Sequence, residues 1–544
     1  MRGLMMDTPL SIISLVQFAA INHSDAEIVS RTVEGPLHRY SYAASYLRMQ
    51  SLAHVLRALD VEPGTRVATL AWNGFRHFEL YYAVSGIGAV CHTVNPRLTP
   101  EQIRFILDHA QDQVVFTDLS FIGLLEGLCE QLPKVRAYVV MTNRDHMPRT
   151  RLPNVLCYEE EIAKSSDRFD WPALDENTAS SLCYSSGTTG EPKGTLYSHR
   201  STVLHALAAA FPDNFAYSSS ETVLPVVPLF HVNAWGVPYA CPMVGARIVF
   251  PGPRVDPQSL FELIQSERVT FALGVPTIWA QFLAYLRATG ARPSHLKRIT
   301  SGGSAVPSSI ISAYASEFGI EVRQGWGMTE MSPIGLQGML KGKQLDLGEA
   351  EKLRIRSKQG RPVYGVDVRI VDGDGEGLPR DGVAFGELCV RGPWVLSAYY
   401  DNPGASAQSF DAEGWFRTGD VATIDADGFV QIVDRTKDVI KSGGEWISSI
   451  EIESVASGHP DIAEAAVIGL PHPRWGERPL LLVVAKPDRS PAGREIVTYL
   501  TDRLPKLAVP DDVLFVETLP RNATGKILKT RLREEFANHK FQSA

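Results

Sequence analysis

A glycine-rich stretch, YSSGTTGEPKG at residues 184–194, carries the residue types that bind phosphate groups. Its glycines let backbone N–H groups come close to an anion, its serine and threonine hydroxyls can donate hydrogen bonds, and Lys193 adds a positive charge. The stretch follows TASSLCY, which is typical of a strand. It is not a Walker A loop, because Gly194 rather than serine or threonine follows the lysine. Taken alone, it predicts either a phosphate-binding loop or an ordinary solvated turn.

Four later stretches supply the context that a lone glycine-rich loop lacks. They are QGWGMTE at 324–330, WFRTGD at 415–420, DRTKDVIKSGGEWIS at 434–448 and PRNATGK at 520–526. In this order, and together with the loop, they resemble the motifs of the adenylate-forming superfamily of acyl-CoA synthetases, luciferases and peptide-synthetase adenylation domains. The segments PLFHVNAWGVPYA and KSGGEWISSIEIE make the likeness closest to bacterial medium- and long-chain fatty acyl-CoA synthetases and to ligases that activate 3-(methylthio)propionate. The resemblance runs through essentially the whole chain.

This resemblance implies an ATP-dependent acid–CoA ligase. The carboxylate of the acid attacks the α-phosphate of ATP, an acyl-adenylate forms as pyrophosphate leaves, and the CoA thiol then displaces AMP. ATP, Mg²⁺, CoA and a small carboxylic acid are the expected partners. Both steps gather negative charge, so positioned donors and the metal should supply most of the catalysis. Two alternatives are an adenylating enzyme that delivers to a carrier-protein thiol or to oxygen, and a nucleotide sensor without catalysis.

The resemblance also implies which residues hold the nucleotide. Trp326 would stack on the adenine, Thr329 would face the α-phosphate, and Asp420 with its companion Arg435 would bind the ribose hydroxyls. Trp326 stands where relatives often carry tyrosine, so any role of a phenol hydroxyl is lost here. The full set expected at ATP or AMP is Ser185, Ser186, Gly187, Thr188, Thr189, Gly190, Lys193, Gly303, Gln324, Gly325, Trp326, Gly327, Met328, Thr329, Asp420, Ile432, Arg435 and Lys526.

The expected catalytic residues are Lys526, Thr188, Glu330 and His231. Thr188 and Glu330 would contact Mg²⁺, a hard cation that takes few protein oxygens when it bridges phosphates. The alternative for Glu330 is a carboxylate near a helix N-terminus. Lys526, a point charge on a flexible stem, would lie between the acid and the α-phosphate. It would offset a repulsion of about 4 kcal/mol at ~4 Å and an effective dielectric of ~20.

The acyl group is expected to lie against His231, Trp235, Gly302, Gly303 and Trp326. His231 and Trp235 are four residues apart and would share a face if their segment is helical. Trp235 is then either a gate of the acyl pocket or a core residue. A narrow pocket with aromatic walls favours 3-(methylthio)propionate or a short- to medium-chain acid, since each thioether–aromatic contact contributes about 0.3–1.5 kcal/mol. A long-chain acid is the alternative if the indole turns aside.

A change of geometry is expected between the two half-reactions, because Lys526 would occupy the route that CoA needs. In relatives the C-terminal domain turns about a residue two positions after the ribose arginine, which is Lys437 here. The turn would bring in a thiolation segment whose candidate residues are Lys441, Gly443, Gly444, Glu445 and Trp446. The alternative for this segment is an ordinary hairpin turn.

Alternating strand and helix patterns fill the first four-fifths of the chain and predict an α/β fold with doubly wound parallel sheets. In such sheets ligands bind at the carboxyl ends of the strands. From about Arg361 the pattern changes to strands joined by Gly/Asp/Pro turns, which predicts a β-rich subdomain. Beyond Asp438 a compact α+β unit follows. We therefore expect an adenylation domain at 1–433, a hinge at 434–438 and a mobile C-terminal domain at 439–544.

Composition narrows the function classes further. The 544 residues are 44% hydrophobic and 21% charged, with a net charge of −8 and no long basic run, which argues against a nucleic-acid partner. The six cysteines are scattered without a CxxC pair, which is typical of reduced thiols in the cytoplasm. Residues 10–20 imitate a signal peptide only weakly and predict a docked helix. No window has the ~18 apolar residues of a membrane span. A homodimer is expected by analogy with relatives.

Overall fold

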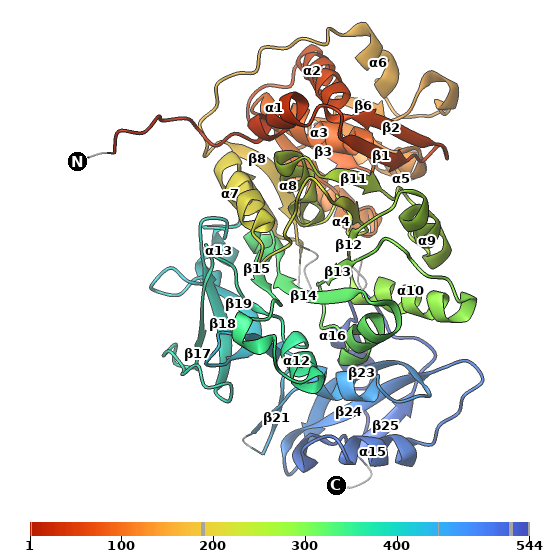
Figure 1. The fold of residues 1–544 in the computed structure, drawn as a ribbon, viewed down its shortest axis with the longest axis vertical. Coiled ribbons are helices and arrows are strands. Elements are labelled where there is room, and N and C mark those ends of the chain that lie inside the picture. The colour runs from red at the N-terminus through yellow and green to blue at the C-terminus, as the bar shows by residue number, and fades with distance from the viewer. Residues whose placement is uncertain (2, 186–190, 444, 522–525, 542–544) are drawn as a thin grey trace.

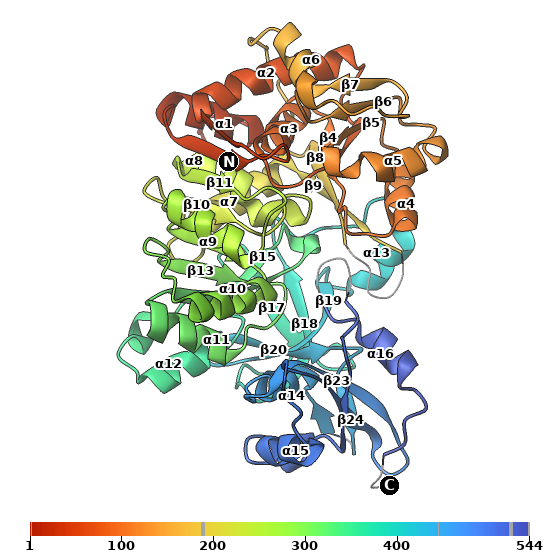
Figure 2. The same ribbon diagram turned by 90° about the vertical axis from the view of Figure 1, so that its right-hand side faces the viewer.

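The computed structural model describes residues 1, 3–185, 191–443, 445–521 and 526–541. Figures 1 and 2 show a large unit built from the first four fifths of the chain, with the C-terminal residues forming a smaller unit below it. The α/β fold with parallel sheets and a smaller C-terminal α/β unit is confirmed. Among the described residues, no helix has the length and apolar character needed to cross a bilayer.

The first sheet of the large unit has seven strands in the order β7-β6-β5-β3-β4-β8-β9. All neighbours are parallel except β8 and β9, which are antiparallel. Strands β4, β5 and β6 are buried at every position, as expected when helices cover both faces of a parallel sheet. The strands are β3 (Arg66–Leu70), β4 (Val90–Thr93), β5 (Val114–Thr117), β6 (Ala137–Val140), β7 (Val155–Cys157), β8 (Ala179–Tyr184) and β9 (Gly194–Ser198).

The second sheet has nine strands in the order β16-β15-β14-β13-β12-β10-β11-β1-β2. It is parallel from β14 to β1 and antiparallel at both edges. The strands are β1 (Glu27–Arg31), β2 (Leu37–Ser41), β10 (Thr222–Pro225), β11 (Arg247–Phe250), β12 (Phe271–Gly274), β13 (Arg298–Ser301), β14 (Glu321–Gly327), β15 (Ile334–Gln337) and β16 (Arg361–Pro362).

Helix α3 (Phe75–Gly86) joins the two sheets, because it contacts β4 and β8 of the first and β1 of the second. All its residues except Arg76 are buried. The expected N-terminal helix is confirmed as α1 (Ile12–Asn22), which docks on α2, α3 and α8. The other helices of the large unit are α2 (Tyr42–Ala58), α4 (Pro100–Ala110), α5 (Ile122–Leu128), α6 (Tyr158–Lys164), α7 (His199–Ala210), α8 (Val237–Val244), α9 (Pro257–Ser266), α10 (Pro276–Thr289), α11 (Ser308–Ala313), α12 (Glu349–Arg356) and α13 (Pro403–Ser409).

The expected β-rich region is confirmed as an antiparallel sheet in the order β17-β18-β19-β20, which flanks the large unit in Figure 1. Its strands are β17 (Asp367–Val371), β18 (Phe385–Arg391), β19 (Phe416–Ile424) and β20 (Val430–Arg435).

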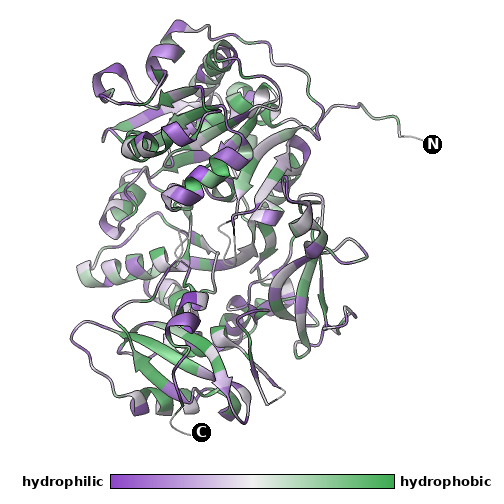
Figure 3. Cartoon of the chain, turned by 180° about the vertical axis from the view of Figure 1, so that it is seen from behind, coloured by the Kyte–Doolittle hydropathy of each residue, from purple (hydrophilic) through white to green (hydrophobic). Residues whose placement is uncertain are grey.

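The C-terminal unit is a five-stranded sheet with apolar residues on both faces, and its strands are prominently hydrophobic in Figure 3. Helices α14 and α15 contribute Ile452 and Leu500 to the core on one face, and α16 contributes Leu532 to the core on the other. The elements are β21 (Ile440–Ser442), β22 (Glu445–Ile447), α14 (Ser449–Ala456), β23 (Ile462–His472), β24 (Gly476–Ala485), α15 (Gly493–Thr501), β25 (Asp512–Phe515) and α16 (Lys529–Glu535).

Candidate active site

The glycine-rich stretch connects the antiparallel strands β8 and β9 at the carboxyl end of β8. At its base the backbone N–H of Ser185 donates to the carbonyl oxygen of Lys193 at 2.9 Å. Five expected phosphate-binding residues lie outside the described residues: Ser186, Gly187, Thr188, Thr189 and Gly190. The strand ends therefore place the loop at the edge of the sheet where ligands of α/β proteins bind.

Tyr399, which the sequence did not single out, brings two predicted residues together. The Nζ atom of Lys193 lies 4.9 Å from the centre of its ring, a cation–π arrangement. Its hydroxyl donates to Oε1 of Glu330 at 2.9 Å. One aromatic side chain thus holds the loop lysine and the candidate metal carboxylate at the same place. Nothing in the VLSAYY segment marks this tyrosine, because its role depends on contacts far along the chain.

The turn that carries Thr329 and Glu330 is fixed from two sides. The hydroxyl of Tyr197, on β9, donates to the carbonyl oxygen of Thr329 at 2.6 Å. Before the turn, Gly327 must be a glycine, because a Cβ atom there would lie 1.8 Å from the carbonyl oxygen of Pro333. Thr329 and Glu330 are both buried. The turn that carries these two predicted site residues is therefore rigid.

The predicted ribose carboxylate has both oxygens engaged. Arg435 Nε lies 2.7 Å from Oδ1 of Asp420, and the indole N–H of Trp326 donates to Oδ2 at 2.9 Å. Asp420 is 3% exposed, so the carboxylate is oriented with little freedom to turn. Beyond the adenine contact that the sequence predicts for Trp326, its N–H orients the neighbouring carboxylate of Asp420.

Two other residues expected at the nucleotide, Gln324 and Ile432, have contacts to neighbouring backbone and core instead of to the residues described above. Gln324 is buried, its Oε1 accepts from the N–H of Val306, and its Nε2 donates to the carbonyl oxygens of Ser357 and Lys358. Through these hydrogen bonds its side chain stabilises the backbone next to β14. Ile432 packs against the core and donates its backbone N–H to Gln359. Both residues support the site through the backbone around it.

Lys526 comes from the C-terminal unit and lies among the charges of the large unit. The residue has an exposed surface, but protein atoms lie densely around its ammonium and displace bulk water. This desolvation, with a smaller contribution from the Arg435 charge, lowers the pKa of Lys526 to about 8, while the charges of Asp420 and Glu330 act in the opposite direction. The two predicted site carboxylates therefore both act electrostatically on this ammonium.

The ammonium of Lys526 also acts on His231. Burial lowers the pKa of His231 to about 4, and the charges of Lys526 and Arg97 add to this effect. The imidazole is neutral at physiological pH. Arg97, another residue that the sequence did not single out, has its guanidinium 5.8 Å from the centre of the Phe230 ring. Its position in the turn NPRLTP gave no signal of a role at the site.

The segment that carries His231 and Trp235, considered above as a possible helix, does not form a right-handed helix. Val232, Asn233, Ala234 and Trp235 all have φ between 47° and 57°, and Gly236 follows with φ 81°. These values form one left-handed turn, labelled η4 (Val232–Gly236). Such a conformation costs roughly 1–2 kcal/mol for each residue other than glycine. The expectation of a shared helical face is therefore wrong, because tertiary contacts impose a different backbone.

Trp235 nevertheless reaches the predicted acyl region. A Cβ atom at Gly302 would lie 3.2 Å from Cη2 of its indole and 2.9 Å from the carbonyl oxygen of Gly325. Gly303, next along the loop after β13, has φ 89°, a value that side chains disfavour. The absence of a Cβ atom at Gly302 therefore lets the indole and the backbone of β14 both pack close to this loop.

The region around the predicted hinge joins the two units through polar contacts. Asp434 is buried and its Oδ2 accepts from both the backbone N–H and the hydroxyl of Ser449, the latter at 2.5 Å. Asp438 pairs with Arg533 at 2.7 Å. Burial lowers the pKa of Lys437, which lies between these contacts. Strand β20 is thus tied to α14, and the end of the predicted hinge is tied to α16.

The predicted thiolation segment is a β-hairpin in which Lys441 pairs with Trp446 across β21 and β22. The Lys441 ammonium lies 5.4 Å from the centre of the Trp446 ring, and that ring lies 5.2 Å from Phe385 of β18. Gly444 is outside the described residues. Gly443 has φ 60° and Glu445 is exposed. In this conformation the hairpin packs on the β-rich sheet through Trp446 and Phe385.

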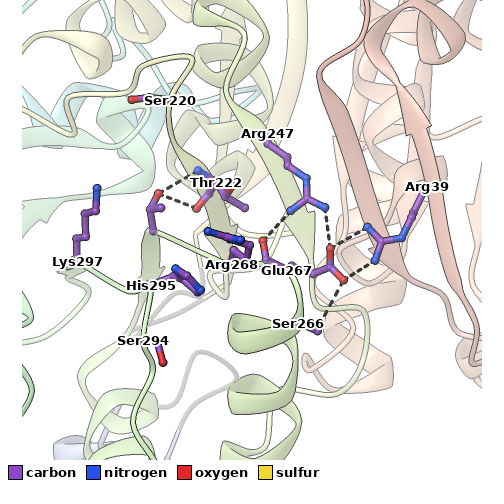
Figure 4. Close-up of a pocket in the computed structure, with 11 residues that line it drawn as sticks. Arg39, Ser220, Thr222, Arg247, Ser266, Glu267, Arg268, Ser294, His295 and Lys297 are labelled. Atoms are coloured by element: carbon purple, nitrogen blue, oxygen red, sulfur yellow. Dashed lines mark hydrogen bonds and ion pairs between the residues drawn. The ribbon is translucent and has the colours of Figure 1, made fainter.

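A separate hollow of about 670 Å³ lies at the opposite edge of the second sheet (Figure 4). It opens at the amino ends of β10 to β13, where Glu267 bridges Arg39 and Arg247. No predicted site residue lines it. Its lining residues are Arg39, Ser220, Thr222, Arg247, Ser266, Glu267, Arg268, Thr270, Ser294, His295 and Lys297.

Comparison of the sequence with known protein families identifies one family. Residues 16–400 match the model of the AMP-binding enzymes, and residues 451–526 match that of the AMP-binding enzyme C-terminal domain. The chain is 48% identical over 538 residues to a medium-chain-fatty-acid–CoA ligase of Ectopseudomonas oleovorans, covering 99% of this chain and 98% of that protein. It is 49% identical over 536 residues to a 3-methylmercaptopropionyl-CoA ligase of Ruegeria pomeroyi, covering 98% and 99%.

A solved structure gives the same result at lower identity. The anthranilate CoA ligase AuaEII in complex with anthranoyl-AMP superposes with a TM-score of 0.87 at 25% identity, covering 97% of this chain and 98% of that one. The chain therefore belongs to the AMP-binding enzyme family, among its adenylate-forming acyl-CoA ligases.

Proposed function

We propose that this ligase joins a short- or medium-chain carboxylic acid, such as 3-(methylthio)propionate, to CoA through an acyl-adenylate, with release of AMP and pyrophosphate. The observation that carries the residue assignment is the place of Lys526, where the charges of Asp420 and Glu330 act on one ammonium. A cation there can hold the acid carboxylate against the α-phosphate of ATP. It offsets a repulsion of about 4 kcal/mol between two like charges at ~4 Å.

The same proposal gives the other polar residues their roles. Asp420, oriented by Trp326 and Arg435, accepts hydrogen bonds from the ribose hydroxyls. Glu330 and Thr188 would hold Mg²⁺. The fit of Glu330 to this role rests on its buried, oriented carboxylate, a ligand that a hard cation prefers. When bound, the ion would supply positive charge where negative charge develops on the phosphates.

The choice of acid rests on the walls of the acyl region. Trp235 stands against Gly302, and His231 is uncharged, so this side of the region is aromatic and neutral. A thioether gains from aromatic faces, by about 0.3–1.5 kcal/mol per contact. The names of the similar ligases from Ectopseudomonas and Ruegeria, which refer to medium-chain fatty acids and to 3-methylmercaptopropionate, support the same choice.

We further propose that the C-terminal domain, 439–544, turns about the hinge 434–438 relative to the adenylation domain, 1–433. The conformation described here has Lys526 among the nucleotide residues and Trp446 on Phe385. A turn about Lys437 would withdraw Lys526 and carry the hairpin with Lys441, Gly443, Gly444, Glu445 and Trp446 toward the CoA path.

Two further proposals concern the cellular compartment and the oligomeric state of the enzyme. All six cysteines are free and five of them are buried, which supports a reducing compartment such as the cytoplasm. The N-terminal arm extends away from the body in Figure 1 and exposes Leu4, Met5 and Met6. Such apolar side chains favour burial against a second copy, which supports a homodimer.

The test is a panel of acids offered to the purified protein with ATP, Mg²⁺ and CoA, with AMP and thioester measured together. 3-(Methylthio)propionate and acids of four to sixteen carbons would be included. The proposal expects equal yields of AMP and thioester, highest for short and medium chains. Preference for the longest acids would overturn the substrate assignment, and AMP formation without dependence on CoA would point to another acceptor.

A further inference from the structure

The left-handed turn at residues 232–236 is a strained element at the wall of the acyl region. A β-branched residue, Val232, is among its members, and such residues are rarely found at positive φ. The turn is short, and α8 begins immediately after it with Val237. A conformation that its own residues disfavour must be held by neighbours. The question is which neighbour holds it.

Asn233 provides the main side-chain contacts of the turn. It is 4% exposed, and its Nδ2 donates to the hydroxyl of Ser181 at 3.1 Å. Its Oδ1 accepts from the thiol of Cys183 at 3.3 Å. The Tyr81 hydroxyl lies 3.1 Å from the same Oδ1 and 2.5 Å from the carbonyl oxygen of Leu229. The amide thus donates one hydrogen bond to β8, and its oxygen faces donors from β8 and α3, all of them fixed elements of the core.

These partners belong to elements that also build the phosphate site. Ser181 and Cys183 lie on β8, whose last residue, Tyr184, begins the glycine-rich stretch. Tyr81 lies on α3, the buried helix that joins the two sheets. Asparagine also tolerates the left-handed conformation better than most residues. Asn233 therefore suits the turn in both backbone and side chain.

The residue that the turn carries toward the acyl region is Trp235. Trp235 is 9% exposed, and its indole packs against Gly302, where a Cβ atom would be only 3.2 Å from Cη2. If the turn relaxed toward the usual right-handed conformation, the direction of the Trp235 side chain would change. The indole would then leave its contact with Gly302 and open space beside that glycine.

We propose that Asn233 is a positioning residue that sets the length of acid the enzyme accepts, by holding the left-handed turn and with it Trp235. This inference rests on the proposed function, because it takes the space beside Trp235 as the acyl site. Asn233 touches neither acid nor nucleotide, so its effect passes through the indole. Loss of its amide lets the indole move and admits longer chains.

The test compares Asn233→Ala with Asn233→Gly. Glycine keeps the freedom for positive φ, whereas both variants lose the amide. For each, kcat and KM would be measured for 3-(methylthio)propionate and for acids of four to sixteen carbons, and KM for ATP separately. We expect the ratio of kcat/KM for long over short acids to rise at least about tenfold in both, with KM for ATP within about twofold of wild type. Ser181→Ala, a milder change to the partner, should shift the ratio in the same direction.

The matched control is Asn214→Ala. Asn214 is equally buried, at 2% exposed, and its Nδ2 donates to the carbonyl oxygen of Ala208. Its loss should lower the melting temperature without changing the chain-length ratio. An unchanged ratio in both Asn233→Gly and Ser181→Ala would overturn the inference, as would an equal shift in Asn214→Ala. If the wild type activates no acid of the panel, the proposed function fails instead, so the two failures are distinguishable.

Discussion

The indole N–H of Trp326 donates a 2.9 Å hydrogen bond to Asp420, a residue 94 positions later in the chain. Arg435 holds the other oxygen of that carboxylate at 2.7 Å. A position where relatives often have tyrosine thus has a residue whose ring can face adenine while its N–H orients the ribose-binding group. The two functions can be separated by substitution.

Trp326→Phe keeps an aromatic face and removes the N–H. A hydrogen bond to a charged group contributes about 1.5 kcal/mol or more, so we expect KM for ATP to rise roughly tenfold with kcat at saturating ATP little changed. Trp279→Phe is the control, since the buried N–H of Trp279 has no partner among the described residues. A rise in KM for ATP no larger than in that control would contradict the role of the indole N–H.

Tyr399→Phe tests the bridge between the glycine-rich loop and Glu330. The ring beneath Lys193 stays, and the hydroxyl that donates to Oε1 of Glu330 is lost. We expect kcat of adenylation to fall about tenfold and the Mg²⁺ concentration for half-maximal rate to rise, because the carboxylate is no longer oriented. ATP–pyrophosphate exchange at varied Mg²⁺ measures both. Tyr400→Phe, one residue away, should leave both values near wild type.

Much of this arrangement could be predicted from local pattern, and some of it could not. The sequence TPEQ indicates the start of a helix, and α4 begins there, with Thr99 and Gln102 forming a capping box. The motif GMTE begins at the last residue of β14, where an α/β fold places ligand-binding residues. The TGD motif instead lies inside β19 of the antiparallel sheet, so its meeting with Trp326 does not follow from that rule. The bond from Asn233 to Ser181 joins residues 52 positions apart and overrides the local preference of the FHVNAW segment. No spacing rule contains such a contact.

Lys526→Ala should separate the two half-reactions. Without the ammonium, the repulsion between carboxylate and α-phosphate is no longer offset, so adenylate formation should fall by at least about a hundredfold. Conversion of supplied acyl-adenylate to thioester should remain within a few-fold of wild type, because the hairpin at 441–446 serves that step. Equal loss of both half-reactions would contradict a role of Lys526 in adenylation alone.

The pKa of Lys526 predicts an alkaline limit for adenylation. Its value of about 8 means that the ammonium loses its proton as pH rises through that value, so kcat/KM should fall above about pH 8. Bound ATP adds negative charge, which raises the pKa of Lys526, so kcat should fall only at higher pH. Lys526→Arg keeps its charge throughout, and its kcat/KM should show no such fall below about pH 10. An identical alkaline limit in that variant would assign the titration to another group.

The contact between Asp434 and Ser449 predicts how the balance of conformations is set. It ties β20 to the first residue of α14, across the proposed hinge at Lys437. Ser449→Ala removes the hydroxyl from a buried carboxylate and weakens the conformation that holds Lys526 at the nucleotide. A population shift of that kind should slow adenylation about three- to tenfold and leave thiolation unchanged or faster. Single-turnover rates for each half-reaction would measure this, with Ser490→Ala, an exposed serine on the same unit, as the control. Slowing of both half-reactions to the same extent would mean that the contact stabilises the fold rather than one conformation of it.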